Sequence, residues 1–128
     1  MSKYHSKKLL YDGILFDSRK EAKRYAQLKQ LEKAGEIMGL RTQVEYELIP
    51  SIYEEVETGE YYKRGENKGT PKVKRQLLEH GVKYVADFVY TDKEGRVIVE
   101  DAKGFRTPEY VLKRKLMLYL KDIKISEI

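Results

Sequence analysis

The sequence contains no cysteine. This absence excludes disulfides, thiolate zinc sites and a cysteine nucleophile, and it fits a reducing compartment. The first ten residues lack the apolar stretch of a signal peptide, and no run approaches the roughly 20 apolar residues that span a bilayer. Internal repeats and low-complexity tracts are also missing. We therefore expect a soluble, cytoplasmic protein.

Charge is the feature that the sequence has in abundance. Of its 128 residues, 37% are charged and 41% are hydrophobic, which is enough apolar material for a folded globule. This length predicts one domain over residues 1–128. The formal net charge of +5 modestly favours an anionic partner, because clustered basic side chains attract a polyanion.

The N-terminal half predicts a hairpin followed by a helix. Two short apolar runs over residues 8–16 flank Asp12-Gly13, a pair typical of tight hairpin turns. Ser18 and Glu21 then have capping-box spacing, good helix formers follow, and Gly35 lies where a helix would stop.

The middle of the chain predicts a strand and then an irregular insertion. Residues 43–53 alternate apolar and polar side chains as a half-buried strand does, until Pro50 interrupts them. Residues 54–81 are rich in charge and glycine but poor in apolar periodicity. We expect this stretch to be a long, mobile basic flap, since loops of such length tend to be functional.

The C-terminal half predicts two strands, a helix and a last strand. Residues 82–90 and 96–102 are β-rich and flank a glycine-containing turn. Thr107-Pro108 offers an N-cap and a first-turn proline for an apolar helix that we expect to be packed on most sides. The tail, residues 122–128, would add a strand parallel to 96–102 through this helical crossover. The predicted fold class is α/β, with an αβββαβ core, a mixed central sheet and an N-terminal β-hairpin.

An acidic residue two positions before a lysine occurs four times, at Glu21, Glu66, Asp101 and Asp122. Only Asp101-Ala102-Lys103 ends an apolar strand. Strand alternation places Asp101 and Lys103 on the face that also carries the two valines at 97 and 99. Burying such a pair costs free energy unless another group compensates.

A second acid, Asp87, interrupts the preceding strand. If the two strands pair normally, Asp87 and Asp101 are cross-strand or diagonal neighbours and repel each other. Mg²⁺, for which Mn²⁺ could substitute, relieves that repulsion because it prefers oxygen ligands. Lys103 could orient a water molecule or stabilise phosphate oxygens. Glu21 lies on the helix stripe that faces the sheet, although capping of Ser18 is an alternative role for it.

These features together resemble the PD-(D/E)XK nuclease superfamily, whose fold is restriction-endonuclease-like. Ala86-Asp87 replaces the Pro-Asp pair, and Asp101-Ala102-Lys103 is the (D/E)XK element. Residues 16–35, 44–48, 84–90, 97–105 and 107–117 also resemble a group of phage and prophage proteins that share a domain of unknown function. Their layout is similar to that of the phage endonuclease I family of Holliday-junction resolvases.

The resemblance implies roles for individual residues. Asp87 and Asp101 would be metal ligands, the carbonyl of Ala102 a further ligand, Lys103 the catalytic lysine and Glu21 the helix acid. It also implies a phage or prophage protein in a bacterial host, which acts on branched DNA as a homodimer.

Other polar residues leave alternatives open. Glu100 falls on the strand face opposite Asp101, which favours solvent or a basic partner over a metal. Several basic residues could bind DNA phosphates or could simply be solvated. They are Lys113 and Lys115 in the last helix and Lys63, Arg64, Lys68, Lys72, Lys74 and Arg75 in the insertion, next to Tyr61 and Tyr62.

The sequence thus predicts a magnesium-dependent DNA endonuclease. A non-catalytic DNA-binding protein that retains the nuclease fold is the alternative, and an RNA substrate is a third possibility for which no recognition feature is evident.

Overall fold

A computed structural model of the chain describes residues 8–102 and 105–128. The chain divides into two compact units, one of Met1–Tyr46 with Tyr84–Ile128 and the other of Glu47–Lys83. We call them the sheet unit and the ribbon unit and describe each by itself.

The sheet unit begins with the predicted hairpin. Strands β1 (Leu9–Tyr11) and β2 (Ile14–Phe16) pair antiparallel. Asp12 and Gly13 connect them with φ angles of 53° and 76°, which a two-residue hairpin turn of the favoured hand requires. The prediction for this turn is confirmed.

Helix α1 (Arg19–Lys33) follows, with Ser18 as its N-cap. The helix ends at Ala34, after which Gly35 adopts a φ of 78° that glycine accepts without steric cost. Both ends lie where the sequence predicted them.

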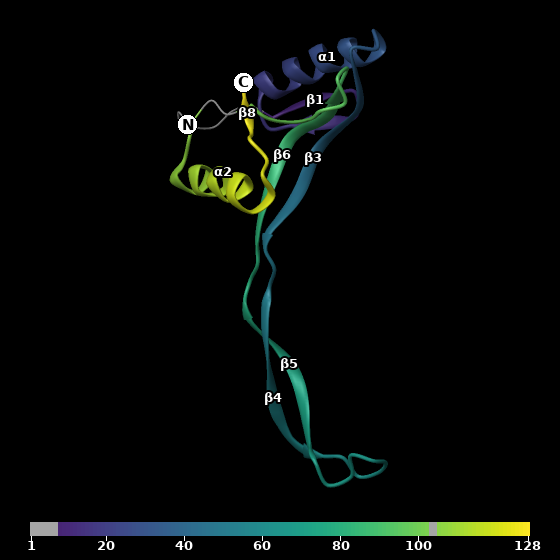
Figure 1. Cartoon of the computed structure of the whole chain (residues 1–128), viewed down its shortest axis with the longest axis vertical. Coiled ribbons are helices and arrows are strands. Elements are labelled where there is room, and N and C mark those ends of the chain that lie inside the picture. The colour runs from purple at the N-terminus through teal and green to yellow at the C-terminus, as the bar shows by residue number, and fades with distance from the viewer. Residues whose placement is uncertain (1–7, 103–104) are drawn as a thin grey trace. The chain divides into compact units, whose positions relative to one another are not determined.

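A mixed four-stranded sheet forms the centre of the unit. Its strands are β3 (Ile37–Ile49), β6 (Val82–Asp92), β7 (Val97–Asp101) and β8 (Ser126–Glu127), in the order β3-β6-β7-β8. Figure 1 shows β3 and β6 side by side. Strands β6 and β7 pair antiparallel, and β7 and β8 pair parallel. The sheet unit is therefore α/β, and its order of elements is the predicted αβββαβ.

Helix α2 (Pro108–Lys121) makes the crossover between β7 and β8, with Thr107 as N-cap and proline in its first turn. The expectation that this helix is packed on most sides is wrong. Only Tyr110 and Met117 of the helix are buried, because a helix on a sheet buries one stripe. Its exposed apolar side chains are Leu112, Leu118, Tyr119 and Leu120. Among the described residues, no helix is long and apolar enough to cross a membrane.

The main core lies between α1, the N-terminal hairpin and one face of the sheet. Tyr25 and Leu28 of α1 pack there with Phe88 and Tyr90 of β6. Residues 89 and 99, which are paired on neighbouring strands and lie on the alternate face, are buried as well. Both faces of the central strands are thus covered, as expected for strands with a continuous apolar run.

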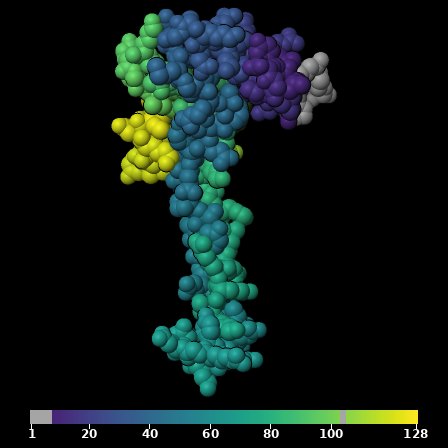
Figure 2. All heavy atoms as spheres, turned by 90° about the vertical axis from the view of Figure 1, so that its right-hand side faces the viewer, coloured from purple at the N-terminus to yellow at the C-terminus, as the bar shows by residue number. Residues whose placement is uncertain are grey.

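The ribbon unit differs from the irregular flap that the sequence predicted. Strands β4 (Ile52–Tyr61) and β5 (Pro71–Glu79) pair antiparallel and form a two-stranded ribbon (Figure 1). The sequence of this segment lacks apolar periodicity because the ribbon buries neither face. Among positions 47–83 the one buried residue is Leu48, which belongs to β3. Figure 2 shows the side chains of this segment standing out on the visible face.

Candidate functional site

The first turn of α1 positions Glu21. The backbone N–H of Glu21 donates to Oγ of the N-cap Ser18, and the Ser18 hydroxyl donates to Oε2 of Glu21, both at 3.2 Å. Glu21 also shares the buried stripe of the helix with Tyr25 and Leu28, and it is only 6% exposed. The predicted capping contact and the predicted sheet-facing position therefore coexist in one residue.

Asp87 is fixed from the sheet. Its Oδ2 accepts a hydrogen bond of 2.8 Å from the backbone N–H of Ala102, the residue that follows β7. The register between β6 and β7 pairs Phe88 with Glu100, so the next pair along the ladder is Asp87 with Asp101. The two acids were predicted as cross-strand or diagonal neighbours, and the strand register agrees with the first of these.

Glu21 and Asp87 form a carboxyl pair. Burial, the negative charge of Asp87 and a hydrogen bond with Asp87 raise the pKa of Glu21 to about 8. Glu21 therefore keeps its proton near neutral pH, because burial and a neighbouring negative charge both disfavour its ionised form. The side chains come from different elements, α1 and β6, so the tertiary fold holds them together.

Asp101 is anchored by an aromatic hydroxyl that the sequence analysis did not consider. The Tyr84 hydroxyl donates to Oδ2 of Asp101 at 2.6 Å, and Asp101 is 1% exposed. Burial and this hydrogen bond raise the pKa of Tyr84 well above its ordinary value, so the phenol stays protonated. The ring of Tyr84 lies 6.5 Å from that of Tyr110, which ties the anchor to α2.

Glu100 has the basic partner that its strand face predicted. Nε and Nη2 of Arg24 donate to the two carboxylate oxygens of Glu100, at 2.9 and 2.7 Å. The Tyr90 hydroxyl also donates to Glu100. Burial and this contact raise the pKa of Tyr90 to about 12. Arg24 is three residues after Glu21, so the ion pair fixes the helix turn that carries Glu21.

Sequence reasoning missed Arg24 and Tyr84. The spacing of three residues from Glu21 was a usable signal for Arg24, since it places both side chains near one face of α1. No sequence signal distinguished Tyr84 from the other tyrosines at apolar positions.

The predicted site has two further members, Lys103 and Ala102. Lys103 lies outside the described residues. Ala102 is partly buried, and its N–H is the donor to Asp87. Within residues 8–102 and 105–128, no group of three or more acidic, histidine or cysteine side chains is arranged to hold a metal ion. The structure thus brings together Glu21 and Asp87 and places Asp101 beside Tyr84.

The two basic residues predicted for DNA binding on α2 have different surroundings. Lys113 forms an ion pair of 2.9 Å with Glu109, one turn earlier in the helix. Lys115 is exposed.

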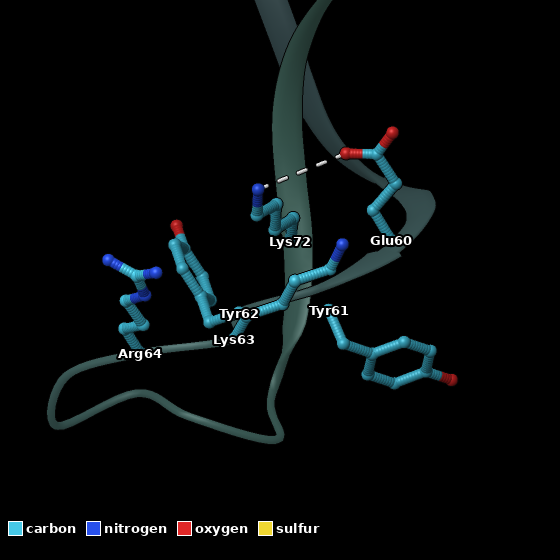
Figure 3. Close-up of a pocket in the computed structure, with 6 residues that line it drawn as sticks. All are labelled: Glu60, Tyr61, Tyr62, Lys63, Arg64 and Lys72. Carbon is cyan, nitrogen blue, oxygen red and sulfur yellow. Dashed lines mark ion pairs between the residues drawn. The ribbon is translucent and has the colours of Figure 1, made fainter.

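The other predicted basic residues lie in the ribbon unit. A hollow of about 490 Å³ at the end of the ribbon is lined by Glu60, Tyr61, Tyr62, Lys63, Arg64 and Lys72. Figure 3 shows Tyr62 and Arg64 on one side of the ribbon and Tyr61 pointing away to the other. Lys72 reaches Glu60 at 3.9 Å, whereas Lys74 and Arg75 are exposed along β5.

These observations define an α/β protein with a mixed sheet and a carboxyl pair between its first helix and a central strand. The chain belongs to the family described as "Protein of unknown function (DUF1064)", whose model matches residues 1–128. A search of the curated proteins and a search of the solved structures each found no significant match.

Proposed function

We propose that this protein is a magnesium-dependent endonuclease that hydrolyses phosphodiester bonds in DNA. The observation that carries the proposal is the Glu21–Asp87 pair. Two carboxyl groups held together by the fold, one of them with a pKa raised to about 8, destabilise each other unless a proton or a cation lies between them. A basic chain with such a pair suits a substrate that is itself a polyanion.

The chemistry of the donors fits Mg²⁺. Glu21 and Asp87 supply carboxylate oxygens, and Asp101 and the carbonyl of Ala102 follow at the adjoining strand end. When bound, the ion would make a water molecule more acidic and would neutralise negative charge on the phosphate. Mn²⁺ has similar ligand preferences and is expected to substitute.

The residues of the chain would have distinct tasks. Glu21 is protonated at neutral pH and would release its proton when a cation binds. The Ala102 N–H orients the carboxylate of Asp87, and the Tyr84 hydroxyl orients that of Asp101. Lys103, two positions after Asp101, is proposed to stabilise the charge that develops on the phosphate oxygens.

The proposed substrate is branched or recombining phage DNA, as the resemblance to junction resolvases suggests. Resolution of a four-way junction needs two cuts, so we propose that the protein acts as a homodimer. Sedimentation that shows a monomer in the presence of junction DNA would count against the dimer.

A cleavage assay tests the activity. Linear, nicked, flapped and four-way DNA are incubated with Mg²⁺ and with the wild type, Asp101→Ala or Lys103→Ala. Both variants should lose cleavage by about 100-fold or more, if cation-assisted catalysis contributes at least about 3 kcal/mol, and both should keep the wild-type circular dichroism spectrum. Asp122→Asn is the matched control, since Asp122-x-Lys124 is the same motif on the surface. Cleavage that is unchanged in Asp101→Ala would refute the proposal.

One observation favours a second candidate, a non-catalytic DNA-binding protein. In the described part of the chain no three ligating side chains converge, and Oδ2 of Asp101 already accepts from Tyr84. Titration with Mg²⁺ and Mn²⁺ discriminates between the two candidates, because the binding protein would take up neither ion.

A further inference from the structure

The charges of the ribbon unit are segregated along the chain. Residues 47–60, which include all of β4 but its last residue, carry five glutamates and no basic residue. Residues 61–75, which form the end of the ribbon and the start of β5, carry six basic residues and one acidic residue. Glu55 is paired with Arg75 across the two strands, so acidic side chains of β4 partly offset the positive charge of β5. The strongest positive charge is therefore at the loop end, which we call the tip (residues 61–72).

The tip is an ordered loop. Tyr62 exchanges backbone hydrogen bonds with the far side of the loop, donating to Thr70 at 3.0 Å and accepting from Gly69 at 2.9 Å. Further turns are closed by Lys68 donating to Gly65 and by Thr70 donating to Asn67. Gly65 and Gly69 have φ angles of 84° and 87°, which other residues rarely adopt. Lys63 and Arg64 are thus exposed on a preorganised backbone, which lowers the entropic cost of binding.

Two aromatic rings of the ribbon, Tyr62 and Tyr53, lie against cations of the ribbon, whereas Tyr61 is 57% exposed. Nζ of Lys72 lies 5.6 Å from the centre of the Tyr62 ring, and Cζ of Arg75 lies 3.8 Å from that of Tyr53. A single strand that stacked its bases on these rings would have to displace the cations. A phosphate group, in contrast, could bind the same cations where they stand. At Tyr62 and Tyr53 the geometry therefore favours phosphate contacts over base stacking.

We infer that the tip of the ribbon enters a groove of double-stranded DNA and supplies a principal part of the affinity for it. This inference rests on the proposed DNA substrate, and it assigns the form of DNA and the surface that binds it. The major groove of B-DNA, about 12 Å wide, admits a two-stranded β-ribbon. Lys63 and Arg64 contact the phosphates that border the groove, and Lys72 adds a third positive charge beside Tyr62 (Figure 3).

The ribbon also carries large apolar side chains that are exposed. A two-stranded ribbon without a covered face is marginally stable in water. Large apolar side chains on it, such as Ile52, Val73 and Leu78, are between 46% and 55% exposed. A second copy of the chain is the other candidate occupant of the ribbon, but the charge at the tip matches a polyanion and would repel an identical tip.

Fluorescence anisotropy in EDTA tests the inference, because binding is then measured without cleavage. The full chain is titrated with a labelled duplex and with a single strand of the same sequence over a range of salt concentrations. Lys63→Ala/Arg64→Ala should weaken duplex binding by about tenfold or more and should lower the salt dependence by about one to two phosphate contacts. Lys33→Ala/Lys124→Ala removes the same charge from exposed positions of the sheet unit and should change affinity by less than about threefold.

A second variant separates the order of the tip from its charge. Gly69→Ala keeps every charge but strains a backbone position with a φ of 87°, so it should also weaken duplex binding. Equal losses in the tip variant and the Lys33/Lys124 control, preferential binding of the single strand, or a tip variant that binds the duplex as the wild type does would each overturn the inference.

The two proposals can fail separately. If the wild type does not cleave DNA with Mg²⁺ but the tip variant loses duplex binding, the proposed interface is supported and the proposed endonuclease activity is refuted. If the wild type cleaves DNA while the tip variant binds the duplex normally, the endonuclease activity is supported and the interface is refuted.

Discussion

The sheet unit buries some of its charged side chains, whereas the ribbon unit exposes its own. In the sheet unit, three acids are at least 94% buried, and each meets a specific partner: Glu21 meets Asp87, Glu100 meets Arg24 and Asp101 meets Tyr84. In the ribbon unit every charged residue is outside the core, and Lys72 and Glu60 form a loose ion pair at 3.9 Å.

This difference separates two physical tasks. A buried acid must be compensated by a donor, an opposite charge, a proton or a cation, so its position is defined to within a hydrogen-bond length. An exposed lysine or arginine contributes little to stability and remains available to a large anionic partner. The sheet unit is thus suited to chemistry at one point, and the ribbon unit to contact along a surface.

The largest effect should come from the Arg24–Glu100 pair. Arg24→Ala leaves the buried Glu100 carboxylate without its cation and should lower the free energy of unfolding by about 3–5 kcal/mol. Arg75→Ala, which removes the cation over Tyr53 in the ribbon, should change it by less than about 1 kcal/mol. Urea unfolding followed by circular dichroism measures both. Equal losses of unfolding free energy would show that charged side chains contribute equally to stability in the two units.

A pair of leucines compares the units by packing. Leu28 of α1 is fully buried, so Leu28→Ala should cost about 2–5 kcal/mol through lost burial and a residual cavity. Leu77 of β5 is 39% exposed, and Leu77→Ala should stay within about 0.5 kcal/mol. The same unfolding experiment measures both variants. A large loss for Leu77→Ala would mean that the ribbon has a covered face in solution.

The carboxyl pair of the sheet unit also predicts a slope of stability against pH. Between pH 4.5 and about 8 the folded state holds a proton on Glu21 that the unfolded chain has released. The free energy of unfolding should therefore fall as the pH rises through this range, since the folded state binds more protons. Glu21→Gln keeps an acceptor for Ser18 and should flatten the slope. A slope that is identical in the variant would show that Glu21 ionises normally.

Much of the fold could be predicted because local signals and burial agree there. The Asp12-Gly13 turn, the Ser18 and Thr107 caps and the order of strands around Asp87 all follow from turn chemistry and apolar periodicity. The ribbon strands could not be predicted in this way, because neither face is buried and pairing leaves no apolar alternation in the sequence.

The candidate site could be predicted only in part. The two strand acids follow from the hairpin register, and the sheet-facing position of Glu21 follows from helix periodicity. The Tyr84–Asp101 and Arg24–Glu100 contacts join residues 17 and 76 positions apart, so tertiary packing and not a local pattern pairs these partners. The exposed apolar face of α2 could not be predicted for a similar reason. Composition indicates how apolar a helix is but not which of its sides are covered.

Calorimetric titration with Mg²⁺ tests most directly whether the Glu21–Asp87 pair holds a cation. Titrations at pH 7 in two buffers of different ionisation enthalpy count the protons released on binding. Because the pKa of Glu21 is about 8, we predict a release approaching one proton in the wild type and weaker binding with almost no release in Glu21→Gln. Mg²⁺ binding that releases no proton, or that is unchanged in Glu21→Gln and Asp87→Asn, would contradict the account.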